Sequence, residues 1–97
     1  MTDVLFLVSR PEAAPILAPL MRACGRRGAR WACFFTGLGV KAAADPAVCK
    51  LLLRAERAVI CEHSWRRFME DAPCPAEFGS QTENSALAQD AARIVSL

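Results

Sequence analysis

The chain has 97 residues, 54% of them hydrophobic, which is enough for one domain with a real core and too short for two. Its net charge of +2, from 12 basic and 10 acidic residues, is too small and too mixed to indicate a nucleic-acid or membrane-surface partner. No apolar run approaches the roughly 20 residues needed to cross a bilayer, and the N-terminus lacks signal-peptide features. We therefore expect a cytoplasmic protein without a membrane span.

The first strand and helix are predicted from one apolar run and one helical stripe. Asp3–Ser9 is almost continuously apolar, as expected of a strand buried on both faces of a parallel sheet. A helix begins near Pro11, where a proline suits the first turn, and ends near Gly25. Pro15 and Pro19 each remove an internal hydrogen bond, so this helix is expected to start late or to kink.

The middle of the chain continues the alternation. Arg30–Thr36 and Arg57–Glu62 read as strands, and a short helix over Pro46–Arg54 lies between them. His63–Asp71 reads as a short helix or an ordered loop. Ala72–Phe78 contains two prolines and is expected to be irregular.

The final elements complete an α/β pattern. Gly79-Ser80 introduces a helix that runs to about Asp90, and Arg93–Leu97 reads as the last strand. Strands that alternate with helices predict a mostly parallel sheet with helices on both faces. Residues 1–97 are therefore expected to form a single three-layer α/β domain, with reactive groups gathered at the carboxyl ends of the strands.

Cys61 is the leading candidate for a reactive side chain. It ends the third predicted strand, at the edge of the sheet where sites are expected, and His63, Arg66 and Arg67 follow closely. Nearby cations or a helix N-terminus lower the pKa of a thiol and favour the reactive thiolate. His63 is the candidate base or proton donor. The alternative interpretation is a buried structural cysteine at a strand end.

The other cysteines carry weaker signals. Cys74 lies between two prolines, where it would be either a second thiol able to react with Cys61 or a loop residue without a role. Cys24, Cys33 and Cys49 lie on apolar faces and are interpreted as packing residues. The chain has no CxxC pair and only one histidine, so we expect neither a zinc site nor any other metal or cofactor.

Two further segments have both a structural and a functional interpretation. Gly37 and Gly39 form part of a GxGxxA pattern, which favours a tight turn, with a small-anion site at these amides and Lys41 as the alternative. Arg26, Arg27 and Arg30 cluster after the first helix. Solvated cations at a helix C-terminus explain that cluster better than phosphate binding does, given the low net charge.

Several segments together resemble one protein family. The strand Ala58–Cys61 ends in a cysteine, Phe34–Val40 joins an aromatic pair to a Gly-Val step, and Arg66-Arg67 supplies a basic pair. Gly79-Ser80, Leu87-Ala88 and Arg93–Leu97 add a matching closing helix and strand. On these residues, which span nearly the whole chain, the sequence resembles the DsrE/DsrF/TusD-like family of sulfur-relay proteins.

The resemblance implies a DsrE-like domain that relays sulfur. Cys61 would accept sulfur as a persulfide and pass it to the thiol of a partner protein, with His63, Arg66 and Arg67 favouring the thiolate. Two other function classes stay open. One is a non-catalytic assembly subunit with an inert Cys61, and the other is a small-anion or nucleotide-binding module that uses the Thr36–Lys41 loop.

The apolar content also predicts a homo-oligomer. A domain of this size has a small interior, yet Trp31, Trp65, Phe68 and Phe78 add four large side chains to those of the strands. Side chains left outside would form the kind of patch that usually marks an interface. The resembled family, whose members typically form oligomers, implies the same.

Overall fold

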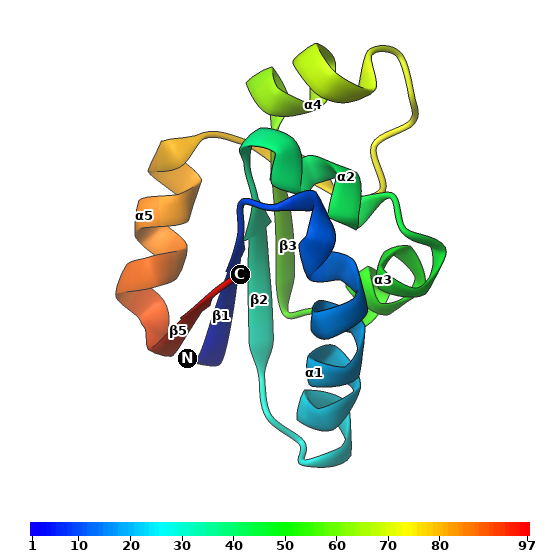
Figure 1. Cartoon of the computed structure of the whole chain (residues 1–97). Helices are drawn as coiled ribbons and strands as arrows, with labels where there is room; N and C mark the ends of the chain where they lie inside the picture. The colour runs from blue at the N-terminus through cyan, green and yellow to red at the C-terminus, as the bar shows by residue number, and fades with distance from the viewer.

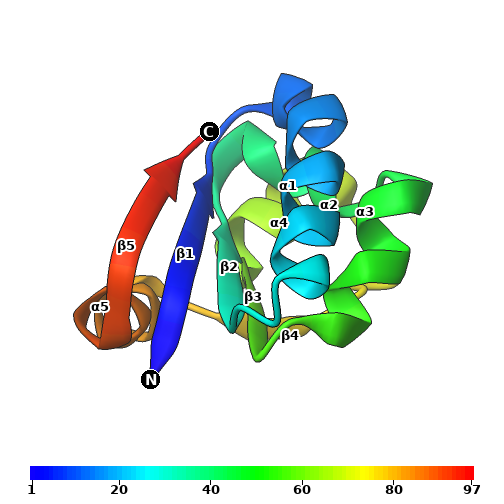
Figure 2. The same ribbon diagram turned by 90° about the horizontal axis from the view of Figure 1, so that it is seen from below.

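The structure, a computed structural model, describes residues 1–97 and contains one sheet of five parallel strands. The strand order is β4-β3-β2-β1-β5. The strands are β1 (Thr2–Val8), β2 (Trp31–Phe35), β3 (Arg57–Cys61), β4 (Glu77–Gly79) and β5 (Ala91–Ser96). The expected parallel α/β architecture is therefore confirmed, and the strands lie side by side in this order in Figure 2.

Helices cover both faces of the sheet. They are α1 (Ala14–Arg26), α2 (Val40–Ala43), α3 (Pro46–Leu51), α4 (Glu62–Met69) and α5 (Gln81–Asp90). Figure 1 shows α1, α2 and α3 on one face, α5 on the other, and α4 above the carboxyl ends of the strands. None of these helices is both long enough and apolar enough to span a membrane.

The core has two layers, one on each face. The larger layer joins Phe6, Trp31 and Phe35 of the strands to apolar residues of α1, α2, α3 and α4. The smaller layer packs Leu87 of α5 against a set of strand residues, namely Leu5, Ala32, Phe34 and Val59. Because β2 is buried on both faces, it lies at the centre of the domain.

The first helix resolves the problem of its prolines by starting late. A 3₁₀ turn at Pro11–Ala13 precedes α1, so that Pro15 falls in the first turn of the α-helix, where its missing N–H costs little. Pro19 lies inside the helix. The chain then reverses through Gly28, whose φ of 67° is in the left-handed region that favours glycine.

Two expectations from the sequence are wrong in part. Residues 72–78 do not stay irregular, because Glu77–Gly79 forms β4, which pairs with β3. The Glu77 carboxylate also accepts two hydrogen bonds from Arg57, at 2.8 and 3.2 Å. Trp31 and Trp65 are not left outside the core, since their exposed fractions are 3% and 1%. These two side chains therefore give no support to an oligomer.

Gly39 allows the loop after β2 to approach β1. A Cβ atom on Gly39 would lie within 2.8 Å of Val8 and Ser9 backbone atoms, which is closer than real Cβ contacts allow. The Thr36 N–H donates to the Val8 carbonyl at 2.9 Å beside this contact. The close approach holds the loop against the carboxyl end of β1.

We predict that Gly39→Ala destabilises the fold by about 2 kcal/mol, because the backbone of β1 has no room to move away from the added methyl group. The matched control is Gly25→Ala in α1, where nothing lies within 4 Å of the added atom. That change should stabilise the protein by roughly 0.5–1 kcal/mol, since alanine favours helix. Urea denaturation of both variants measures the difference. Equal effects of the two substitutions would contradict the steric argument.

Candidate functional site

Cys61 lies where a strand becomes a helix. It is the last residue of β3 and the N-cap of α4, whose first helical residue is Glu62. The β-branched run before it favours a strand, and an acidic residue in the first turn suits the positive end of a helix. Cys61 pairs in register with Gly79 of β4 and is partly exposed. The expected position at the carboxyl edge of the sheet is therefore observed.

Hydrogen bonds to the sulfur favour the thiolate of Cys61. Partial burial raises the pKa of the thiol, but donors from two segments outweigh that effect and leave the pKa below its ordinary value. The donors are the Ser64 hydroxyl and amide, the Thr36 hydroxyl and the His63 amide. The amides belong to the first turn of α4, where backbone N–H groups have no partner inside the helix.

Ser64 is itself held in place by the loop after β2. Its side chain is buried, and its Oγ accepts a hydrogen bond from the Gly37 N–H at 2.9 Å. The oxygen is then occupied as an acceptor, which directs the Ser64 O–H to the sulfur of Cys61. Gly37 adopts a φ of 57°, a conformation that residues with a Cβ rarely take. The loop after β2 and the start of α4 thus both contribute groups that lower the pKa of Cys61.

An open groove lies beside Cys61. Its volume is about 760 Å³, and it is bounded by the start of α4 and by residues 78–83 at the end of β4 and the start of α5. Both helices point their N-termini toward this end of the sheet, since Cys61 caps α4 and Ser80 caps α5. The Ser80 Oγ accepts from the Thr82 N–H at 3.2 Å. Two positive helix ends beside one groove favour an anion there.

The basic side chains do not act on Cys61 as the sequence suggested. Arg66 lines the groove, but it forms an ion pair with Glu62 at 2.9 Å and lies over the Phe78 ring, 5.2 Å from the centroid. Arg67 lies over Phe68 and outside the groove. The lowered pKa of Cys61 comes from hydrogen bonds rather than from these cations.

His63 adjoins Cys61 at the start of α4. Its backbone N–H contributes to the lowered pKa of Cys61, and its exposed imidazole lines the groove. A side chain in that position can reach a reactant that enters the groove. The role of His63 as base or proton donor stays a prediction.

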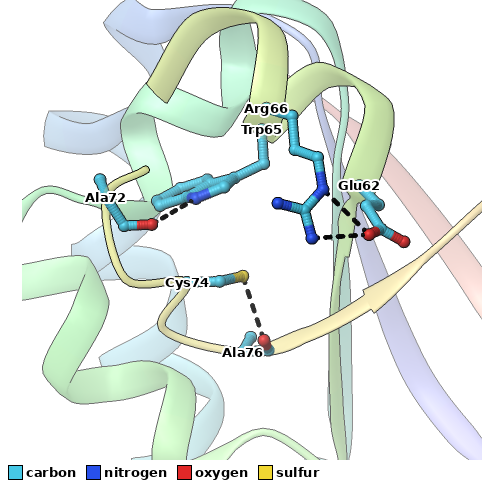
Figure 3. A network of polar contacts seen from close by, with 6 residues as sticks. All are labelled: Glu62, Trp65, Arg66, Ala72, Cys74 and Ala76. Carbon is cyan, nitrogen blue, oxygen red and sulfur yellow. Dashed lines mark hydrogen bonds and ion pairs between the residues drawn. The ribbon is translucent and has the colours of Figure 1, made fainter. Parts of the chain in front are cut away.

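Cys74 is not brought to Cys61. Figure 3 shows it in the loop beneath α4, near Trp65, whose Nε1 donates to the Ala72 carbonyl at 2.8 Å. The Cys74 thiol donates to the Ala76 carbonyl at 3.1 Å. Cys74 packs with the larger core layer, whereas Cys61 packs with the α5 layer on the other face. Burial and the nearby Glu62 charge raise the pKa of Cys74, although the Ala76 amide lowers it.

Cys33 and Cys24 are poorly suited to reaction. Cys33 is fully buried and its pKa is strongly raised by that burial. The pKa of Cys24 is raised by burial and by the charge of Asp3. No three His, Cys, Asp or Glu side chains lie together in a way that would hold a metal ion. Cys61 is the cysteine whose surroundings favour its anion.

The loop Thr36–Lys41 supports Cys61 and offers few free amides. The Gly37 N–H is bound to Ser64, the Gly39 N–H donates to the Thr36 carbonyl at 3.0 Å, and the Val40 N–H also bonds within the loop. Lys41 is exposed on α2. An anion would therefore have to displace existing hydrogen bonds to bind at these amides.

The sequence interpretation missed the specific roles of Ser64 and Thr36. The spacing Cys61-x-x-Ser64 at a strand–helix junction was an available signal, because the N-cap and the third helical residue face each other. No family model, curated protein or solved structure matches the chain. Function is therefore inferred from the chemistry of this site, a partly exposed sulfur whose anion is stabilised beside an open groove.

We predict that Cys61 alkylates fastest of the five cysteines at neutral pH, because a lower pKa gives a larger thiolate fraction there. Ser64→Ala removes one donor to the anion, so the pH profile of Cys61 should shift upward by about 1 to 2 pH units. Thr82→Ala, which removes an exposed hydroxyl from the same groove without removing a helix cap, is the control and should not shift it. Iodoacetamide rates followed by peptide mass spectrometry provide the measurement. A Ser64→Ala profile that superimposes on the wild-type profile would contradict the role of the Ser64 hydroxyl in lowering the pKa of Cys61.

Proposed function

We propose that this protein is a sulfur carrier of the DsrE-like kind, in which Cys61 holds sulfur as a persulfide and passes it to a partner thiol. The observation that carries the proposal is a partly exposed sulfur at the carboxyl edge of the sheet, whose pKa is lowered by the hydroxyls of Ser64 and Thr36 and by the first amides of α4. A sulfur carrier needs a thiol that is anionic near neutral pH and accessible to another sulfur atom. Among the five cysteines, Cys61 best combines both properties.

The transfer chemistry requires no external oxidant. The Cys61 thiolate attacks the outer sulfur of a donor persulfide, the donor's sulfur–sulfur bond breaks, and its electron pair leaves with the donor thiolate. Cys61 then carries one additional sulfur. In the second half-reaction an acceptor thiolate attacks that outer sulfur, and Cys61 leaves as the thiolate. A thiol with a lowered pKa is also the better leaving group.

The groove is suited to a protein partner. It is wide, open, and bounded by short polar side chains of α5 and by the Arg66–Phe78 pair, so a cysteine on a protruding loop can reach Cys61. His63 lies on the same rim and would supply a proton to the departing thiolate. Arg66, held by Glu62 and Phe78, would shape the entrance to the groove.

The alternative functions have less support. A non-catalytic assembly subunit would not need surroundings that lower the pKa of Cys61. An anion-binding module at Thr36–Lys41 would need backbone donors that the loop already uses internally. Cys74 takes no direct part in the proposed reaction, since it lies on the other face of the sheet with a raised pKa.

We predict that Cys61→Ser abolishes persulfide loading while it leaves the fold intact, because serine is nearly isosteric and the position is partly exposed. The protein would be incubated with a persulfide donor and digested, and the gain of one sulfur would be located by mass spectrometry. Cys74→Ser is the matched control and should load as the wild type does. Undiminished uptake by Cys61→Ser would move the role to another cysteine.

We also predict that the protein forms a homo-oligomer in solution. Although the tryptophans are buried, Ile16, Leu53 and Ile94 are large apolar side chains with exposed fractions of 56%, 87% and 48%. Their burial between subunits would remove apolar surface from water. Light scattering at micromolar concentration should give a multiple of the chain mass of 10.5 kDa. A mass that stays at the monomer value as the sample is concentrated would refute this prediction.

A further inference from the structure

A second hollow lies at the opposite end of the sheet from Cys61. It has a volume of about 530 Å³ and is built from the last turns of α1, the start of β2 and the segment that precedes β3. Trp31 is the first residue of β2 and lies at the amino edge of the sheet, whereas Cys61 lies at the carboxyl edge. We call it the arginine hollow, after Arg22, Arg26 and Arg54 in its lining.

The three arginines of this hollow have no carboxylate partner. The chain's ion pairs are Arg30–Glu56, Arg57–Glu77 and Arg66–Glu62. Glu56 follows Arg54 closely in sequence, but it accepts from Thr2 at 2.6 Å and pairs with Arg30. Three exposed arginines without a carboxylate partner therefore line one hollow, in a protein whose net charge is only +2.

Helix capping does not account for this cluster. Cations near a helix C-terminus commonly bind its last carbonyl groups, but here backbone N–H groups already fill that role. The Ala23 carbonyl accepts from Arg27, the Cys24 carbonyl from Ala29 and the Gly25 carbonyl from Gly28. Moreover, Arg54 comes from a different element, the 3₁₀ turn Leu52–Arg54. The arginines that line the hollow therefore come from two elements, α1 and this 3₁₀ turn.

The rest of the lining is apolar. Met21, Trp31 and Leu51 border the hollow and are themselves buried, with exposed fractions of 1%, 3% and 9%. Small-molecule sites are typically concave, of about 300–1,000 Å³, and combine apolar walls with a few polar groups. Arginine is the side chain best suited to bind phosphate oxygens with two parallel N–H groups. A hollow of this size accepts a small molecule rather than a nucleic-acid duplex.

We propose that the arginine hollow binds a phosphorylated small molecule. Arg22, Arg26 and Arg54 hold the phosphate groups above the buried floor that Met21, Trp31 and Leu51 form. The site is independent of sulfur transfer, because it lies at the other edge of the sheet. Consequently Cys61→Ser should bind the same ligand unchanged, and failure of the sulfur proposal would not affect this one.

The test is a titration with pyrophosphate and with ADP at an ionic strength of about 0.15 M, where long-range attraction is largely screened. The two tryptophan indole N–H signals in an NMR spectrum report the location. The Trp31 signal should move to saturation, while that of Trp65, buried under α4, should not. ADP and pyrophosphate should bind with similar affinity, because both carry a diphosphate and the buried apolar floor offers the nucleoside little surface.

The variants distinguish a built site from a diffuse charge. Arg22→Gln, Arg26→Gln and Arg54→Gln should each weaken ADP binding roughly tenfold, as expected for loss of one charge-assisted hydrogen bond. Arg27→Gln removes the same charge at the same helix end but outside the hollow, and should change the affinity less than twofold. Equal losses for all four variants, or absence of saturable binding, would overturn the proposal. Binding of a DNA duplex that ADP cannot displace would overturn it as well.

Discussion

Parallel pairing of all five strands is the constraint on which the rest of this structure depends. Every strand must be followed by a crossover, so every carboxyl end reaches the same edge of the sheet. The segments after β2, β3 and β4 meet there, and they supply Thr36, Cys61 and Ser80. Residues separated by tens of positions thereby form one groove. No local feature of the chain could place them together.

Within that frame, the hydrogen bond from Gly37 to Ser64 orients one of the groups that lower the pKa of Cys61. The Gly37 N–H engages the Ser64 oxygen and leaves its hydroxyl proton for Cys61. Neutral donors fixed by backbone geometry lose less with added salt than a mobile Arg or Lys near the surface does. They also favour the thiolate both as nucleophile and as leaving group. The proposed carrier role, in which sulfur is both accepted and released, is better served by this symmetry than by a strong permanent ion pair.

The sequence predicted the fold better than the site, for a physical reason. Buried parallel strands and amphipathic helices produce local patterns, so β1, β2, β3 and α1 were recognisable. Strand β4 was missed because three residues after two prolines have no periodicity, and their pairing partner lies elsewhere in the chain. Ser64 was missed as a donor for a similar reason, since its own support is Gly37, 27 positions away. The burial of Trp31 and Trp65 likewise depends on tertiary packing that composition does not describe.

The same distinction between local and non-local information changes how Arg22 and Arg26 are interpreted. Within α1 alone, Arg22 and Arg26 are ordinary cations near the C-terminus of a helix, and exposure to water is enough to explain their presence. The crossover to β3 brings Arg54 to the same hollow, while Trp31 at the start of β2 supplies an apolar wall. Because all strands run in the same direction, the sheet places the two sites at its opposite edges. A thiolate site forms where the strands end and helices begin, and an anion-binding hollow forms where helices end and strands begin.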